Sequence, residues 1–104
     1  MRLTETGLRE WWGELSRGDA EATIKKLLQY GDLDYHAHAM ESMLGLRNAP
    51  VKVMTEAVLA SYVSGKTGRI LQAIRHGGDP TDSWHDITCY SMMGRYVRQF
   101  GAWP

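Results

Sequence analysis

The chain has 104 residues, of which 43% are hydrophobic and 23% charged, a composition typical of one soluble globular domain over 1–104. Twelve basic and twelve acidic residues give zero formal net charge with no basic run, which argues against binding to duplex nucleic acid. No run reaches the roughly 20 apolar residues of a membrane span, and the N-terminus lacks a signal-peptide core, so we expect a cytoplasmic protein without a membrane partner. The single cysteine, Cys89, excludes an internal disulfide, and we expect it to be a small buried thiol.

Apolar residues in the first part of the chain recur at helical spacing. A short amphipathic helix is predicted over 6–17, ended by Gly18, with a second helix that begins at Asp19 as its cap and ends near Gly31. Lys25 and Lys26 are expected to point outward from this second helix. The residues that share the apolar face of the first helix are Leu8, Trp11, Trp12 and Leu15. The tryptophan pair suits either the core or a subunit interface, and four tryptophans in so short a chain favour a homodimer or homotetramer.

Two further helices are expected in the middle of the chain. One is predicted over 34–44 with His36 on its apolar stripe, where a buried hydrogen-bonded histidine and a functional one are both open. The other, over 51–76, is the longest and is apolar almost all round from Val51 to Val63, as expected for a central helix. Glu56 is the acid within that apolar run, and a carboxylate there must be paired or bind a cation.

The segment 60–67, ASYVSGKT, satisfies a loose phosphate-loop pattern. That motif needs a buried strand, a loop of free backbone N–H groups and a helix N-terminus facing the phosphates. No second strand follows in this chain, so we interpret the match as chance.

The last expected helix, 79–100, begins with Asp79 as a cap, Pro80 in the first helical position and Asp82 in the first turn. Asp82 and Asp86 are four residues apart and project from one face. They either line a metal-binding cleft or serve the helix dipole and solvent. The stripe expected to pack on neighbouring helices is formed by Ile87, Tyr90, Gly94 and Val97. Every segment follows the helical period, which predicts an all-α fold of four or five helices.

Three motifs resemble a known family: YGD (30–32), the Lys66/Arg69 pair and DSWHDITCY (82–90). Together they resemble the MazG-like nucleotide pyrophosphohydrolases, in particular the small nucleotide-modification-associated group of phages and bacteria. In that group a long helix ends in a Lys-x-x-Arg-like element, and a final helix reads roughly Asp-Ser-x-x-Asp-Ile-x-Gly-Tyr. The resemblance spans about 19–97 and implies a MazG-like oligomeric helical bundle.

The resemblance also implies Mg²⁺-dependent hydrolysis of a (deoxy)nucleoside triphosphate to the monophosphate and pyrophosphate. Carboxylates suit Mg²⁺, which activates water and neutralises phosphate charge, while Lys and Arg hold phosphate oxygens. The carboxylates that would act in catalysis and hold the metal are Asp82, Asp86 and Glu56. The residues that would contact the substrate are Lys66, Arg69, Tyr30 and His36.

Three departures from the family pattern keep other functions open. Cys89 stands where glycine is usual, His36 stands where an asparagine often follows the YGD element, and no Glu-x-x-Glu pair is present. The alternative to the enzyme is a catalytically inactive MazG-like module that binds a nucleotide or a host protein. A third hypothesis is an interaction protein that contacts its partner through Trp11, Trp12 and Trp103.

Overall fold

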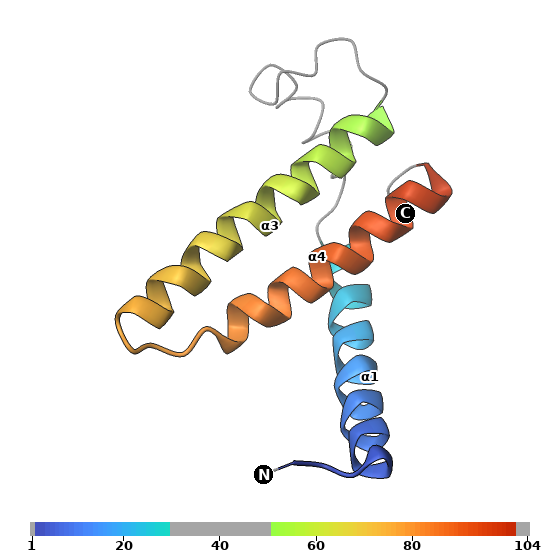
Figure 1. The fold of residues 1–104 in the computed structure, drawn as a ribbon. Helices are drawn as coiled ribbons and strands as arrows, with labels where there is room; N and C mark the ends of the chain where they lie inside the picture. The colour runs from blue at the N-terminus through green and yellow to red at the C-terminus, as the bar shows by residue number, and fades with distance from the viewer. Residues whose placement is uncertain (1, 30–50, 102–104) are drawn as a thin grey trace.

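The computed structural model describes residues 2–29 and 51–101, which form three helices and no strand (Figure 1). These are α1 (Glu5–Gln29), α3 (Val51–Arg75) and α4 (Thr81–Phe100). The predicted all-α class is confirmed for these ranges. The helix expected over 34–44 and the candidate residues Tyr30, His36 and Trp103 lie outside them, so the count of four or five helices stays a prediction. None of the described helices is long and apolar enough to cross a membrane.

Helix α1 is continuous, so the predicted break at Gly18 and the predicted cap at Asp19 are wrong. A glycine inside a helix costs about 1 kcal/mol relative to alanine, which tertiary packing readily offsets. Here Asp19 and Thr23 are buried against α4. The Thr23 hydroxyl donates to the Asp19 backbone carbonyl at 2.7 Å and approaches the Met92 sulfur at 3.5 Å.

The chain reverses between α3 and α4 at Gly77-Gly78, the pair that separates the helices predicted over 51–76 and 79–100. Gly77 has φ +71°, a left-handed conformation that favours glycine, and the Gly78 N–H donates to the Ala73 carbonyl at 2.7 Å. Helix α4 begins one residue later than predicted, so its N-cap is Pro80 and the prediction of Asp79 as the cap is wrong. The Asp79 carboxylate nevertheless accepts from the Thr81 N–H at 3.0 Å. The Thr81 hydroxyl and backbone N–H hold the pKa of Asp79 below its usual value.

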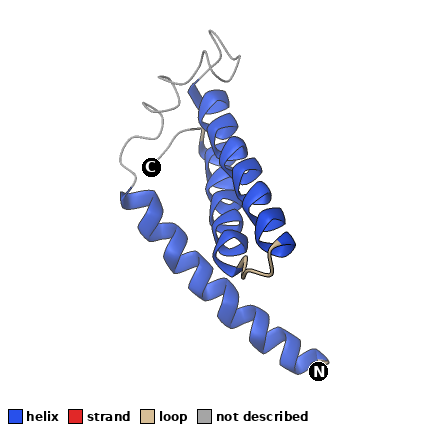
Figure 2. Ribbon diagram, turned by 90° about the vertical axis from the view of Figure 1, so that its left-hand side faces the viewer, coloured by secondary structure: helices blue, strands red, loops and turns tan. Residues whose placement is uncertain are grey.

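The core lies between α3 and α4, which pack along each other, while α1 crosses α4 and projects beyond it (Figures 1 and 2). The buried side chains of this core are Met54, Val58, Leu59, Cys89, Met93 and Val97. Burial of the Cys89 thiol is thus confirmed. The predicted packing stripe of α4 is correct for Val97, which is buried, and for Tyr90, which is partly buried and packs against the core, whereas Ile87 and Gly94 are only partly buried.

The apolar side chains in the N-terminal half of α1 are left exposed among the residues that the structure describes. Trp11 and Trp12 are 49% and 62% exposed, and their rings meet edge to face at 5.2 Å. The tryptophan pair therefore lies outside the core formed by residues 2–29 and 51–101, and the subunit-interface alternative stays a prediction.

Candidate functional site

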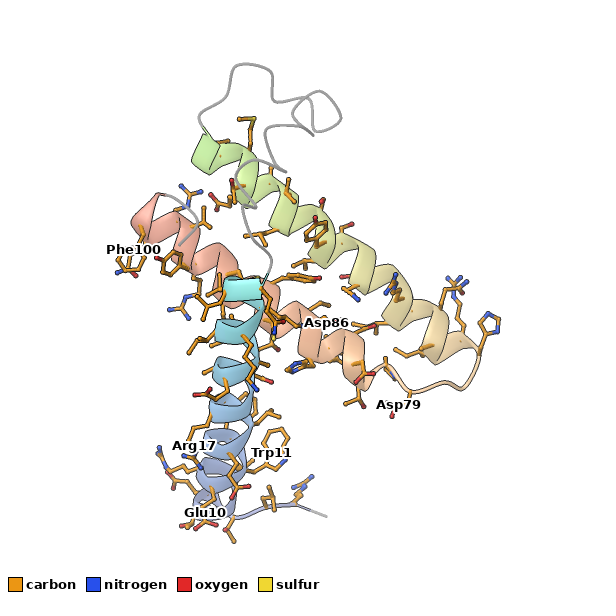
Figure 3. The ribbon with its side chains drawn as sticks, turned by 180° about the vertical axis from the view of Figure 1, so that it is seen from behind. Glu10, Trp11, Arg17, Asp79, Asp86 and Phe100 are labelled. Carbon is orange, nitrogen blue, oxygen red and sulfur yellow. The ribbon has the colours of Figure 1, made fainter. Side chains whose placement is uncertain are left out.

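Asp86 lies between two lysines that come from different helices. Its Oδ1 is 2.9 Å from Lys26 Nζ of α1, and its Oδ2 is 2.8 Å from Lys66 Nζ of α3. Figure 3 shows Asp86 on α4 beside the C-terminal end of α1. These three side chains are only 18–25% exposed, so the two contacts join all three helices through one partly buried carboxylate. The expectation that Lys26 points outward is wrong.

The charges of this cluster stabilise one another. Burial opposes ionisation of Asp86, but hydrogen bonds from Lys66 and Lys26 outweigh it and lower the pKa of the carboxyl group. Burial likewise opposes the charge of Lys26, yet the hydrogen bond to Asp86 and nearby negative charge raise its pKa. Both groups are therefore ionised at neutral pH.

A pocket of about 290 Å³ opens beside this cluster, between α3 and Tyr90 of α4. Its lining residues are Ser61, Tyr62, Gly65, Lys66, Arg69 and Tyr90. The structure thus brings Lys66 and Arg69 together in one pocket, as their spacing predicts. The two tyrosine rings lie 5.3 Å apart, and burial together with the neighbouring Tyr90 raises the pKa of Tyr62, so that the Tyr62 hydroxyl stays protonated and can donate.

The electrostatics of the pocket favour an anion. Lys66 and Arg69 line it, and Lys26 lies 5.9 Å from the centre of the Tyr90 ring. These three cations and Asp86 leave a local net charge of +2, which a phosphate dianion would neutralise. Lys26, Tyr62 and Tyr90 were not among the expected site residues.

The predicted carboxylates do not gather around this pocket. Glu56 is paired with Arg98 at 3.0 Å and lines a different groove, which also contains Arg95. Asp82 is exposed in the first turn of α4, and Asp86 is already held by two ammonium groups. Within residues 2–29 and 51–101, no three acidic, histidine or cysteine side chains could hold a metal ion together. The described residues therefore do not fit the Mg²⁺ site implied by the resemblance.

The segment 60–67 lies inside α3, with neither a strand nor a helix N-terminus at that position. Its interpretation as a chance match to a phosphate loop is confirmed. Lys66 nevertheless faces the pocket, but as a residue of a continuous helix rather than of a loop.

Comparison with protein-family models, curated proteins and solved structures finds no match to this chain. The MazG-like resemblance accordingly rests on the three motifs alone and stays a prediction.

Proposed function

We propose that this chain is a nucleotide-binding module that holds a nucleoside phosphate in the pocket between α3 and α4. The observation that supports this proposal is that two partly buried tyrosines lie beside three cations, and that Asp86 balances only one of the three positive charges. The MazG-like resemblance favours the same ligand class.

Each part of a nucleotide has a suitable partner in the pocket. The Arg69 guanidinium can form two parallel hydrogen bonds to a phosphate, and the Lys66 ammonium supplies a compact charge. The Tyr62 and Tyr90 rings offer aromatic surface for a base. A volume of about 290 Å³ is at the lower end of small-molecule sites and suits a single nucleotide.

The geometry favours the alternative of binding without hydrolysis, because Glu56 and Asp86 are paired with cations and Asp82 is exposed. Mg²⁺-dependent hydrolysis to the monophosphate and pyrophosphate, as in MazG-like enzymes, stays a prediction. We also expect a homodimer or homotetramer, because Leu8, Trp11 and Trp12 are 48%, 49% and 62% exposed on one stretch of α1. A cytoplasmic location stays a prediction.

The test is a titration of nucleoside mono-, di- and triphosphates by calorimetry, with and without Mg²⁺. Arg69→Gln is expected to weaken binding about 10- to 100-fold, because it removes a charge-assisted contact of about 1.5–3 kcal/mol. Arg75→Gln is the matched control, since Arg75 is an exposed arginine in the last turn of the same helix. Equal affinities for the two variants, or no binding of any nucleotide, would contradict the proposal.

A pyrophosphate assay on the same samples separates the two functions. Mg²⁺-dependent release of pyrophosphate would establish that the protein is an enzyme. The metal would then need ligands other than those that the described residues supply. Binding without product would establish the module.

A further inference from the structure

The groove that contains Glu56 and Arg95 lies between α3 and α4 and has a volume of about 310 Å³. Its lining residues are Glu56, Leu59, Ala60, Val63, Tyr90, Ser91, Gly94, Arg95 and Arg98. No residue of α1 lines this groove, and neither do His85 and Asp86, the residues of α4 that bond to α1. Helix α1 therefore does not cover the groove in its docked position.

The walls of the groove offer space beside apolar side chains. Leu59, Ala60 and Val63 form its apolar side on α3. On α4, Gly94 contributes no side chain, and a Cβ built at this position would point into open space. A cavity of this kind suits a hydrocarbon chain, which gains free energy by leaving water.

The charged side chains of the groove leave one positive charge unbalanced. Glu56 Oε1 lies 3.2 Å from Arg98 Nε and 3.0 Å from Arg98 Nη2, so these two charges balance each other. The Arg95 guanidinium makes no ion pair within residues 2–29 and 51–101. Two arginines and one glutamate give a local net charge of +1, which a ligand with a single negative charge would neutralise.

Apolar walls beside one unbalanced arginine fit a chain that ends in a carboxylate. The planar guanidinium matches the two carboxylate oxygens and can bind them through two parallel hydrogen bonds. A volume of about 310 Å³ is at the lower end of small-molecule sites, which favours one short chain over a segment of another protein. A nucleotide fits this groove less well than the pocket beside Lys66, because the charge of a phosphate dianion exceeds +1.

We propose that this groove is a binding site for a medium-chain fatty acid. The carboxylate pairs with Arg95, and the hydrocarbon chain lies along Ala60, Val63 and Gly94. Tyr90 lines both this groove and the nucleotide pocket, but Lys66 and Arg69 line only the pocket. The fatty-acid site therefore does not depend on nucleotide binding, and either site can exist without the other.

The test is a titration of the full chain with hexanoate, octanoate and decanoate, followed by NMR amide chemical shifts. Each methylene that enters the groove should tighten binding about three- to fourfold. The shifted amides should include those of Ser91, Gly94 and Arg95. Octylammonium has the same chain length as octanoate and the opposite charge, so it should bind about 10-fold more weakly. Equal affinities for octanoate and octylammonium, or no saturable binding of any carboxylate, would overturn the proposal.

A variant that fills the groove tests where the chain lies. Gly94→Leu should weaken octanoate binding about 10-fold or more, because the leucine takes the place of several methylenes of the ligand. Gly68→Leu is the matched control, since a Cβ at Gly68 also points into open space and Gly68 lines neither the groove nor the nucleotide pocket. Leucine favours a helix more than glycine does, so both variants should fold. Equal octanoate affinities for the two folded variants would contradict the assigned position of the chain.

Two further variants change the charge of the groove in opposite directions. Arg95→Gln should weaken octanoate binding about 2- to 5-fold, the range of one exposed charge pair. Glu56→Gln should strengthen binding by a similar factor, because it removes a negative charge and frees Arg98 for the carboxylate. Adsorption of the chain to the exposed tryptophans of α1 would respond to neither change. Octanoate affinities equal to that of the wild type in both variants would therefore refute the site, even if Gly94→Leu failed to fold.

Discussion

Asp86→Asn should destabilise the protein markedly, although it only replaces one carboxylate oxygen with an amide NH2 group. In the wild type the Asp86 carboxylate lies 2.9 Å from Lys26 and 2.8 Å from Lys66. The substitution removes this negative charge and leaves the two ammonium groups close to each other. A hydrogen bond to a charged group contributes about 1.5–3 kcal/mol, and an amide oxygen can replace only part of it. Because these side chains are 18–25% exposed, solvent screens the interaction, so we expect a loss of about 2–3 kcal/mol for both contacts together.

This loss is large enough to measure. For a domain of about 100 residues, 1 kcal/mol shifts the melting temperature by about 4–8 °C, so a loss of about 2–3 kcal/mol should lower the melting temperature of Asp86→Asn by about 8–24 °C. Urea denaturation followed by circular dichroism gives the free energy directly. Asp82→Asn is the control on the same helix, where only a helix-dipole contribution of about 0.3–1 kcal/mol is at stake.

The result also tests the metal hypothesis. Carboxylates that gather to bind Mg²⁺ repel one another in the absence of metal, so removing one would stabilise the folded protein or leave it unchanged. An Asp86→Asn variant as stable as the wild type, or no less stable than Asp82→Asn, would refute the assignment of Asp86 as the anion between two lysines.

Three further outcomes are expected from the same denaturation experiments. Met93→Ala should cost about 2–5 kcal/mol, because the side chain is fully buried between α3 and α4. Gly77→Ala should cost about 1–2 kcal/mol because its φ is +71°, whereas a Cβ at Gly78 would meet Ala73 at an ordinary 3.6 Å and cost less. The stability difference between wild type and Asp86→Asn should be constant from about pH 5 to 9. It should begin to shrink as the pH falls below about 4, where an unfolded aspartate takes up its proton, and should be lost as the pH falls through the lowered pKa of Asp86. It should also begin to shrink above about pH 10.5, where an unfolded lysine loses its proton, and should be lost as the pH rises through the raised pKa of Lys26.

The parts of the fold that the sequence predicts well are those that local chemistry decides. The bounds of α3 and α4 follow from apolar periodicity and from Gly77-Gly78, where the chain must adopt a left-handed conformation. The break expected at Gly18 failed because the local preference is worth only about 1 kcal/mol. Burial of Asp19 and Thr23 against a helix more than 60 residues later outweighs it, and periodicity within α1 carries no information on that contact.

The same distinction applies to the candidate site. Lys66 and Arg69 are three residues apart on one helix, and that spacing alone predicts that they share a surface. The spacing of Asp82 and Asp86 predicts their common face equally well, yet it does not show which charges meet Asp86. The Lys26–Asp86 contact joins residues 60 positions apart, and a lysine beside apolar residues gives no sign of so distant a partner.

Helix α1 is positioned by polar contacts as well as by apolar packing, and the candidate site depends on that position. Asp19 of α1 meets a base on α4 and Lys26 meets an acid, so the two contacts have opposite polarity. If α1 were rotated or displaced along α4, both contacts would be lost and polar groups would be left without partners in partly buried positions, which costs about 1–3 kcal/mol for each group. The two contacts therefore favour one docking geometry of α1 over the neighbouring ones. That geometry brings Lys26 beside Asp86 and the anion pocket, so the proposed nucleotide site requires the docked helix.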